Sequence, residues 1–462
     1  MTRQRERTLT ALLSTLGRGE GTDAALLLVC GRSDRIEPPP FRVIPLGERL
    51  EIARGDGASA RPTPSVGAPP VELLLDDALI SGHHARVERT AGGHQVLDLG
   101  SKNGTFVDGA RVATETALAD GARLFLGSHA FVFRRALVTD LEALDEELAE
   151  PLGPVATASP ALARLCHKLR RLAPTDAELL LTGETGVGKE VYARAVHAAS
   201  GRRGRFLAIN CAALPRELVE SELFGYVRGA HSQARDSKPG LLEEADGGTL
   251  FLDEIGEMSS ELQAKLLRFA QDRLLTPIGG TQCRRIDARI LAATNRLEPL
   301  AEPGGVGLRA DLMNRLGAEP LQLPPLREHP EDLGLLTAHF LAGCARRLEP
   351  AVFRTLCLHS WPGNVRELEK SLQEAEVLSR GAATIDLEHL PARIAEQHRQ
   401  RPRPALAQRG RPAPSGAELE ALLRRHQGNM TRVARELDRQ PALVYRWVER
   451  FQLDPDTFRI KQ

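Results

Sequence analysis

The stretch Leu179-Leu-Leu-Thr-Gly-Glu-Thr-Gly-Val-Gly-Lys-Glu190 decides the fold of the central part of this chain. A short apolar run leads directly into a glycine-rich turn, and a helical stretch follows. Glycines let backbone N–H groups close on phosphate oxygens, and the amino end of a helix favours an anion. The residues expected to contact a nucleotide are Gly183, Glu184, Thr185, Gly186, Val187, Gly188, Lys189 and Glu190. A glycine-rich turn without a ligand is the alternative.

A second motif carries the acids that nucleotide hydrolysis requires. Leu250-Phe-Leu-Asp-Glu254 is an apolar strand that ends in two carboxylates. We expect Lys189 to reach the β- and γ-phosphates, Asp253 to hold Mg²⁺ through water, and Glu254 to orient or deprotonate the attacking water. A capping role for either acid is the alternative. Glu190 stands where the general P-loop motif has Ser or Thr for Mg²⁺.

Length and composition limit the other possibilities. A chain of 462 residues is too long for one core, so two to four domains are expected. The 61 basic and 61 acidic residues balance, but residues 393–462 hold fifteen Lys or Arg against eight Asp or Glu. That excess favours contact with a polyanion, although a solvated tail has the same composition. The six cysteines form no CxxC or Cys/His cluster, and neither a signal peptide nor a membrane span is apparent, so we expect a cytoplasmic protein.

The distribution of apolar runs and turn residues along the chain predicts several domains. From residue 24 to about 136, short apolar runs alternate with turn signals, as in a β-sandwich. These runs are Ala24–Cys30, Phe41–Ile44, Arg49–Ala53, Val71–Leu75, Ala85–Glu88, Gln95–Leu99, Arg123–Leu126 and Ala130–Arg134. Residues 55–70 are rich in Gly, Pro, Ser and Ala and are expected to form a long disordered loop.

The central region predicts a parallel α/β sheet, because helical stretches alternate with buried-strand runs. The strand candidates are Leu179–Thr182, Phe206–Asn210, Thr249–Asp253 and Arg289–Thr294. We therefore expect a tail (1–22), a β-sandwich (23–136), a linker (137–152), an α/β ATPase (153–325), a helical lid (326–392), an Arg/Pro-rich linker (393–414) and an all-α DNA-binding domain (415–462).

Ordered motifs between about 153 and 392 resemble the AAA+ domain of bacterial enhancer-binding proteins, the sigma-54-dependent transcription activators. They are Gly183–Glu190, Asn210–Ala213, Glu222–Gly225, Gly247–Ile255, Ala292–Asn295, Leu323–Glu328 and Trp361–Leu368. A Glu after the P-loop Lys is normal in that family, which accounts for Glu190. So many ordered motifs over some 240 residues exclude chance similarity.

The resemblance implies roles for residues outside the two nucleotide motifs. Asn210 corresponds to a residue that holds Glu254 inactive until the γ-phosphate is sensed, while Thr294 and Asn295 occupy the first sensor position. The remaining matches are arginines: Arg309 and Arg315, which reach into the neighbouring subunit's site, and Arg366 of the lid, which reports nucleotide state. A guanidinium neutralises charge on the transferring phosphoryl group, although surface salt bridges are the alternative. A shared site implies a ring, expected to be a hexamer.

A loop of this family, Gly-Ala-Phe-Thr-Gly-Ala, projects from the ring and pushes on sigma-54. The corresponding residues here are Gly229, Ala230, His231, Ser232, Gln233 and Ala234. His231 replaces the aromatic tip and Gln233 replaces a glycine whose backbone freedom the loop would use. Both action on sigma-54 promoters and regulation by another route therefore stay open.

The N-terminal region resembles a forkhead-associated (FHA) domain, a β-sandwich that binds phosphothreonine through loops at one end. The matching motifs are Ser81–His84, Leu97–Thr105, Gly109, Asp120–Gly121 and Leu126–Gly127. Arg54 would pair with the phosphate, and Ser81 and Asn103 would contact the phosphate and the peptide backbone. Ala53 replaces the usual glycine before Arg54. A module for protein interaction or oligomerisation is the alternative.

The C-terminal region resembles the Fis-type helix-turn-helix that ends enhancer-binding proteins. Apolar residues spaced by three and four between 418 and 451 predict packed short helices, the last of which should enter the major groove. Tyr445, Arg446 and Arg450 are expected to face DNA, and Arg432 and Arg435 to grip phosphates. A helical dimerisation tail is the alternative.

These features together predict an ATP-hydrolysing, DNA-binding transcription regulator that acts on sigma-54 polymerase and senses a phosphothreonine peptide. The competing interpretation is an AAA+ DNA-binding regulator that does not remodel sigma-54, acting as a repressor or through another polymerase form. A general AAA+ remodeller of another protein is a third possibility, which the C-terminal helices oppose.

Overall fold

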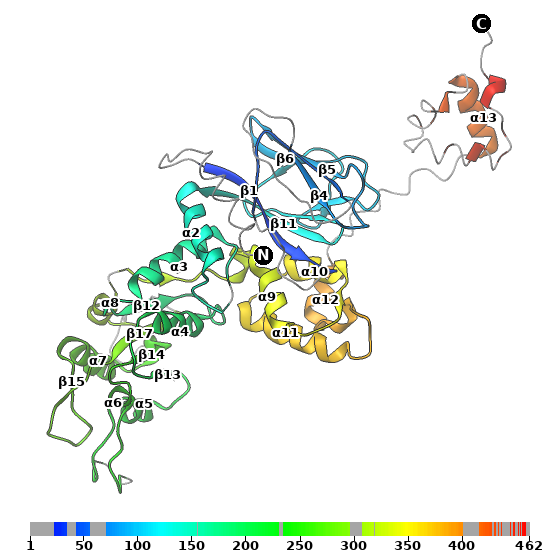
Figure 1. Cartoon of the computed structure of the whole chain (residues 1–462). Coiled ribbons are helices and arrows are strands. Elements are labelled where there is room, and N and C mark those ends of the chain that lie inside the picture. Colours follow the sequence, from blue (N-terminus) through cyan, green and yellow to red (C-terminus); the bar gives the residue numbers. More distant parts are fainter. Residues whose placement is uncertain are drawn as a thin grey trace. The chain divides into compact units, whose positions relative to one another are not determined.

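The computed structural model describes residues 23–34, 43–55, 71–154, 156–230, 234–295, 307–317 and 319–400, and parts of 415–458. The chain divides into two compact units, residues 1–398 and 399–462, and each is considered by itself. In Figure 1 the first unit runs from the blue N-terminal strands through the green sheet to the yellow helices.

An N-terminal β-sandwich opens the first unit. One sheet has the order β2-β1-β11-β10-β7-β8 and the other β4-β3-β5-β6-β9. The first sheet comprises β1 (Asp23–Arg32), β2 (Val43–Pro45), β7 (Thr105–Val107), β8 (Ala110–Arg111), β10 (Arg123–Leu126) and β11 (His129–Leu137). The second comprises β3 (Arg49–Arg54), β4 (Val71–Leu75), β5 (Ala85–Thr90), β6 (Gly93–Asp98) and β9 (Thr116–Leu118). The predicted sandwich is confirmed, and the short strands β7, β8 and β9 are additions.

Strand β11 is apolar on both faces. Phe131 and Phe133 point into the core between the two sheets, whereas Ala130 and Val132 belong to a different apolar cluster. Alternation along a strand puts these two pairs on opposite faces. The inner face of the sandwich is therefore buried, and part of its outer face is also covered by other elements.

Two helices lead from the sandwich to the next domain. Helix α2 (Val138–Ala149) packs on α3 (Pro160–Leu172), and Leu141 and Leu144 share an apolar cluster with Ala163. The segment expected to be a linker (137–152) therefore contains a helix, and this helix is packed on α3.

The central domain is a five-stranded parallel sheet with the order β13-β14-β17-β12-β18. Its strands are β12 (Leu179–Thr182), β13 (Phe206–Asn210), β14 (Thr249–Asp253), β17 (Arg289–Thr294) and β18 (Leu321–Gln322). The helices of this domain are α4 (Lys189–Ala199), α5 (Arg216–Phe224), α6 (Leu241–Glu244), η2 (Ile255–Glu257), α7 (Ser260–Asp272) and α8 (Ala310–Leu316). Strands β15 (Leu274–Leu275) and β16 (Arg284–Arg285) form a separate hairpin. The four predicted strands are confirmed at their predicted bounds.

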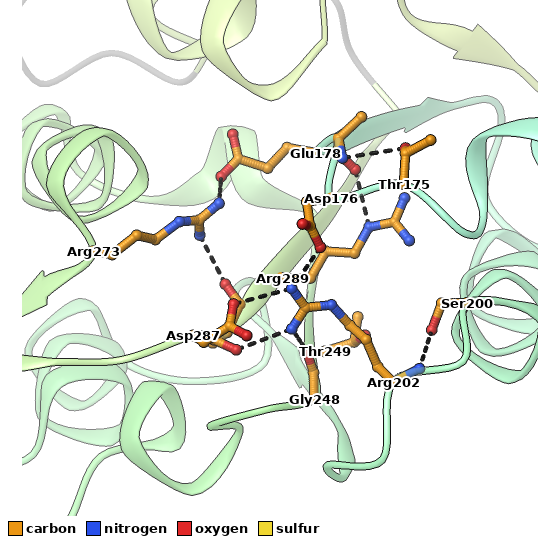
Figure 2. A network of polar contacts seen from close by, with 12 residues as sticks. Thr175, Asp176, Glu178, Ser200, Arg202, Gly248, Thr249, Arg273, Asp287 and Arg289 are labelled. Atoms are coloured by element: carbon orange, nitrogen blue, oxygen red, sulfur yellow. Dashed lines mark hydrogen bonds and ion pairs between the residues drawn. The ribbon is translucent and has the colours of Figure 1, made fainter.

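A polar network holds the amino ends of these parallel strands (Figure 2). The guanidinium of Arg289, which is 1% exposed, donates to the carbonyls of Leu172, Ala173 and Ala177. Arg202 donates to the carbonyls of Gly248 and Asp287 and to two carboxylates. Because buried backbone carbonyls need donors, this network ties α3 and the preceding loops to the sheet edge opposite the P-loop.

A helical lid follows the sheet, with α9 (Leu333–Phe340), α10 (Pro350–Leu358), α11 (Asn364–Leu378) and α12 (Ala392–Gln400). Its remaining elements are η3 (Leu326–Glu328), η4 (Pro330–Asp332), β19 (Arg347–Leu348), β20 (Thr384–Ile385) and η5 (Leu387–His389). Trp361 is fully buried here and donates its indole N–H to the carbonyl of Leu356. Ile394 and Ala395 of α12 join the lid core, so the lid continues into the segment expected to begin a linker.

The second unit contains α13 (Gly416–Arg425) and η6 (Pro455–Phe458). Ser415 caps α13 in a capping box with Glu418, which satisfies amide groups at the helix start. One apolar cluster joins Leu419, Leu423, Met430, Val433, Val444, Trp447 and Val448. This cluster agrees with the packing expected from the apolar spacing between residues 418 and 451.

Among the residues that the structure describes, no helix is both long enough and apolar enough to span a bilayer.

Candidate nucleotide and phosphopeptide sites

The P-loop connects β12 to α4 at the carboxyl end of the parallel sheet. Lys189 begins α4 and is 6% exposed. Its ammonium donates to the carbonyls of Gly183 (2.9 Å) and Glu184 (3.4 Å) and lies 3.6 Å from Glu254 Oε1. The predicted contact residues Gly183–Lys189 thus form one turn around this cation. A nearly buried ammonium at a helix start is suited to receive phosphate oxygens.

Asp253 is the last residue of β14, and it lies directly opposite Asn210 of β13 in the sheet register. The amide of Asn210 donates to Asp253 Oδ2 at 3.2 Å, while its carbonyl accepts from the amides of Ala212 and Ala213. The expected partner of Asn210 is Glu254, but this structure pairs it with Asp253. Parallel pairing explains this, because Asn210 and Asp253 end adjacent strands in register.

The environment of Asp253 suits a divalent cation. Burial raises the pKa of this carboxyl, and the neighbouring Glu254 raises it further, while Lys189 opposes the shift. A bound cation would relieve both effects by compensating two adjacent negative charges. Carboxylate oxygens are ligands that Mg²⁺ prefers, so the residues present fit this ion. Among the described residues, no group of three or more His, Cys, Asp or Glu converges in a pattern that would hold a metal alone.

Glu254 has a left-handed backbone with φ of 53° and ψ of 49°. A non-glycine residue in this region stores strain and is concentrated at functional sites. The turn directs its carboxylate toward two neighbours: the Lys189 ammonium and the backbone amide of Asn295, which donates to Oε2 at 3.0 Å. Asn295 follows Thr294, the last residue of β17. The predicted sensor residues therefore adjoin the predicted catalytic acid.

The P-loop also touches the lid. Glu184 forms a bidentate ion pair with Arg327 (2.6 and 2.8 Å), and the Asn364 amide donates to the same carboxylate and to the Thr185 carbonyl, both at 3.1 Å. Arg327 first, and then Asn364, lower the pKa of Glu184 to about 2. Neither Arg327 nor Asn364 was among the predicted site residues, although both lie within motifs quoted for the family resemblance.

Gly186 fits at this contact because it has no side chain. A Cβ at this position would lie 2.4 Å from the carbonyl oxygen of Gly363, and φ is +85°. The backbone amide of Arg366 donates to the Gly186 carbonyl at 3.3 Å. The backbone of Arg366, the predicted lid arginine, thus lies next to the P-loop, and its side chain is exposed.

The other predicted charged residues make contacts within their own subunit. Glu190 is exposed and pairs with Arg194 one turn later on α4. Arg309 forms a bidentate pair with Asp311. Arg315 donates to the Ala270 carbonyl at 2.7 Å, and its Nε lies 3.6 Å from Glu178 Oε2. The side chains of Arg309 and Arg315 remain 33% and 42% exposed, so both are accessible to a neighbouring molecule.

The base of the predicted sigma-contact loop is well defined. Gly229 donates to the Ala234 carbonyl at 2.8 Å, closing the loop, and Ala230 packs on Gly279 after the β15 strand. Val227 donates to the Ile278 carbonyl, which ties the loop to the β15–β16 hairpin. The tip residues His231, Ser232 and Gln233 lie outside the described residues.

The three predicted phosphopeptide residues lie on adjoining loops of the sandwich. The Arg54 amide donates to the Ser81 carbonyl at 3.0 Å, and Ser81 Oγ accepts from the Lys102 amide at 3.1 Å. Asn103 donates to the Leu79 carbonyl at 2.7 Å. Arg54 is exposed at the end of β3. One basic side chain, one hydroxyl and one amide therefore meet at one rim, as phosphopeptide recognition requires.

His84 is fully buried and supports the loops of this rim through two hydrogen bonds. Its Nδ1 accepts from the Ser81 amide at 3.1 Å, which leaves Nε2–H to donate to the Gly104 carbonyl at 3.4 Å. Burial lowers the pKa of His84, in agreement with this neutral tautomer. His84 therefore has a structural role at this rim.

The predicted DNA contacts Arg432, Arg435, Tyr445, Arg446 and Arg450 all lie outside the described residues.

Three family models match this chain. The model described as the sigma-54 interaction domain matches residues 155–322, the AAA+ ATPase lid domain model matches 327–407, and the FHA domain model matches 65–127.

Known proteins with similar sequences are transcription regulators. The transcriptional regulatory protein GlrR of Escherichia coli (strain K12) is 38% identical over 341 residues, covering 70% of this chain and 73% of GlrR. The regulatory protein AtoC of the same organism is 44% identical over 251 residues, covering 52% of this chain and 54% of AtoC. Among solved structures, NtrX from Brucella abortus in complex with ATP is 31% identical, covers 68% of this chain and 74% of that chain, and has a TM-score of 0.47.

Proposed function

Because this chain belongs to the family of AAA+ transcription regulators that carry the sigma-54 interaction domain, we propose that it drives transcription by sigma-54 RNA polymerase through ATP hydrolysis. The ATPase domain itself is shown by the family match. The observation that carries the proposal is the convergence of Lys189, Asp253 and Glu254 within that domain, where Lys189 lies 3.6 Å from Glu254.

Residues of this chain have separate tasks in hydrolysis. Lys189 binds phosphate oxygens and thereby leaves Glu254, which becomes free to hold the attacking water and take its proton. Asn210 orients Asp253, which would hold Mg²⁺ through water. When bound, Mg²⁺ neutralises charge on the β- and γ-phosphates.

Two contacts make the site sensitive to the nucleotide. The Asn295 amide fixes the Glu254 carboxylate, so a change at the γ-phosphate is passed to the end of β17. Glu184 joins the P-loop to Arg327 and Asn364 of the lid region, so P-loop closure moves with the lid. Contacts of this kind are either made or broken, which is the property that switching needs.

The active form is proposed to be a ring, with six subunits expected. Arg309 directly precedes α8 and Arg315 lies within it, and their side chains are 33% and 42% exposed. An arginine supplied by a neighbour neutralises charge in phosphoryl transfer and makes hydrolysis depend on assembly.

The N-terminal FHA domain is proposed to sense a phosphothreonine peptide. Arg54 is exposed beside Ser81 and Asn103, and the loops that hold them are joined by hydrogen bonds. Such an array binds a dianionic phosphate through charge-assisted hydrogen bonds.

The C-terminal unit is proposed to bind an upstream DNA site. Its apolar cluster contains the packing residues expected for short helices, and the basic excess of residues 393–462 favours a polyanion. The proposed contacts remain Arg432, Arg435, Tyr445, Arg446 and Arg450.

A second candidate function is an ATP-controlled DNA-binding regulator that does not remodel sigma-54. It is favoured by the loop between Gly229 and Ala234, where His231 and Gln233 replace the aromatic tip and a glycine of the family pattern. In this form ATP governs assembly alone.

Nucleotide-dependent association with sigma-54 separates the two candidates. Purified chain is mixed with sigma-54 and ADP–aluminium fluoride, a mimic of the transferring phosphoryl group, and complexes are resolved by gel filtration. Co-elution that requires the mimic and disappears in a Lys189→Ala variant supports remodelling. Absence of co-elution from a chain that hydrolyses ATP favours the second candidate.

A further inference from the structure

Part of the outer face of the FHA sandwich is covered by the ATPase lid of the same chain. Cys30, Phe125, Ala130 and Val132 of β1, β10 and β11 share one apolar cluster with lid residues, and all four are at most 3% exposed. The lid members of this cluster include Leu326, Leu333, Val352, Phe353, Leu356 and Cys357. A cluster of this kind belongs to a packed core rather than to a loose domain contact.

The contact between the sandwich strands β1, β10 and β11 and the lid is called the FHA–lid joint. At its centre the backbones of β1 and α9 meet directly. A Cβ on Gly334 of α9 would lie 1.8 Å from the Cys30 carbonyl oxygen, and a Cβ on Gly31 would lie 2.9 Å from the Phe353 ring. Only glycine fits at position 334 without displacement of β1. The thiol of Cys30 lies 3.7 Å from that of Cys357 and contacts the Pro330 carbonyl.

Charged groups add specificity to the joint. Arg134 of β11 pairs with Glu331, whose carboxylate is fully buried, at 2.9 and 3.3 Å, and also donates to the Glu328 carbonyl. Arg354 of α10 lies over the rings of Phe106 and Phe125 of the sandwich, at 4.1 and 5.6 Å from their centroids. A buried charge without its partner is costly, so each pair fixes how the two surfaces meet in the docked arrangement.

The joint lies on a short path between the two predicted ligand sites. On one side, Asp77 precedes Ser81 and accepts hydrogen bonds from the Ser128 amide and from His129 at the start of β11. On the other side, the segment from Leu326 to Asp332 carries Glu331 at the joint.

The same segment also carries Arg327, which pairs with Glu184 of the P-loop. Only three residues separate Arg327 from Glu331. Movement of the sandwich on the lid therefore moves a segment that holds the P-loop.

We propose that the FHA sandwich docks on the lid of its own chain and that this docking couples the loop bearing Ser81 to the nucleotide site. The coupling rests on the ATP site proposed above, whereas the docking does not. In the docked state Glu331 fixes the position of Arg327, and Arg327 keeps the P-loop in its nucleotide-binding form. Release of the sandwich lowers affinity for ATP.

Two variants break the joint by different means. Arg134→Glu places a second carboxylate opposite Glu331. Gly334→Leu inserts a side chain where no space exists and leaves the Arg134–Glu331 ion pair unchanged. Arg135→Glu is the matched control, because Arg135 is the next residue on β11 and is exposed. Combining Arg134→Glu with Glu331→Arg restores opposite charges and tests whether the pairing itself matters.

Docking is measured by thiol alkylation with a maleimide in the full chain. Exposed Cys283 is the fast reference and buried Cys166 of α3 is the slow one. We expect Cys30 to react as slowly as Cys166 in the wild type and in Arg135→Glu, and to approach the rate of Cys283 in both joint variants. Rapid alkylation of Cys30 in the folded wild type would overturn docking.

Coupling is measured as the Kd of a fluorescent ATP analogue. Both joint variants should bind it about tenfold more weakly, as is typical of coupling between sites, with recovery in the charge-swapped pair. If Cys30 becomes reactive in the joint variants and their Kd is unchanged, the proposed coupling is wrong, while the assignment of the ATP site stands. If the wild type itself binds no analogue, the ATP assignment fails, while Cys30 protection still decides docking.

Discussion

The backbone amide of Asn295 donates a hydrogen bond to the carboxylate of Glu254, although the two residues are 41 positions apart in sequence. Asn295 follows the end of β17 and Glu254 follows the end of β14, and these strands are neighbours in the parallel sheet. The carboxyl ends of adjacent parallel strands meet at one edge, where ligands of α/β folds bind. This contact is the simplest route by which the predicted sensor segment controls the predicted catalytic acid.

Replacing Glu254 by Gln should abolish hydrolysis and preserve ATP binding. The amide keeps the size of the side chain but cannot accept the proton of the attacking water, so turnover should fall by ~10²–10⁴. Phosphate release and binding of a fluorescent ATP analogue measure the two effects separately. Glu261→Gln, on the exposed first turn of α7, is the control. Normal turnover in Glu254→Gln would reject the catalytic assignment.

Arg315 should act on the nucleotide of a neighbouring subunit. Arg315→Ala alone and Lys189→Ala alone should each lose most ATPase activity, since one lacks the charge supplied in trans and the other lacks the phosphate contact. Mixing the two variants should restore part of the activity, because one interface then combines an intact P-loop with an intact arginine. A mixture as inactive as its components would argue that Arg315 acts within its own subunit or only in folding.

Arg54→Ala should remove binding of phosphothreonine peptides. The lost guanidinium is the only basic group among the three predicted contact residues, and charge-assisted hydrogen bonds to phosphate are the strongest available. Fluorescence polarisation with a phosphothreonine peptide library measures the loss, with Arg49→Ala at the other end of β3 as control. A library in which the wild type finds no phosphorylated binder would contradict the sensor assignment.

Asp77→Asn should destabilise the FHA sandwich in a pH-dependent way. Hydrogen bonds from His129, Ser128 and Leu79 outweigh burial and hold the pKa of Asp77 well below its usual range. A depressed native pKa contributes stability above the unfolded pKa of about 3.9, and this contribution is lost as pH falls toward the native pKa.

Urea unfolding of the full chain measures this effect. At pH 7 the variant should lose ~1–3 kcal/mol in the transition of the sandwich. The difference from wild type should shrink below about pH 4. A difference independent of pH would mean that the Asp77 charge does not contribute.

Replacing the loop tip by the family sequence should strengthen action on sigma-54. The triple variant His231→Phe, Ser232→Thr, Gln233→Gly restores an aromatic tip and a flexible glycine. ATPase activity should be unchanged, since the base of this loop lies apart from Lys189 in sequence and is closed by its own Gly229–Ala234 hydrogen bond. Co-elution with sigma-54 in ADP–aluminium fluoride measures the gain, and a loss of co-elution would show that the native tip is already adapted to its target.

Local sequence predicted the parallel sheet well. Strands β12, β14 and β17 are buried along almost their whole length and therefore appear as largely apolar runs between turns, whereas β13 at the edge of the sheet is only partly buried. Strand β18 (Leu321–Gln322) and the FHA strands β7 to β9 have only two or three residues, too few to show a period. Their pairing depends on neighbours that the sequence alone does not identify.

The site contacts that the sequence could not predict join segments that are far apart along the chain. The family resemblance implies that Asn210 contacts Glu254, but strand register brings it to Asp253. The pairing of Glu184 with Arg327 joins residues 143 positions apart, so no local pattern predicts it. For the FHA–lid joint one signal is present in the sequence: Ala130 and Val132 alternate with Phe131 and Phe133 along β11, so both faces of the strand are apolar. That pattern predicts cover on a sandwich's outer face.

Open-complex formation tests the central claim most directly. Sigma-54 RNA polymerase is incubated on a supercoiled plasmid that carries a sigma-54 promoter downstream of the DNA fragment this chain binds most tightly. Permanganate reactivity of promoter thymines reports strand opening. We predict opening that requires both the protein and ATP and that fails with Glu254→Gln. Continued ATP turnover by the wild type with no opened promoter would contradict the proposed coupling to sigma-54.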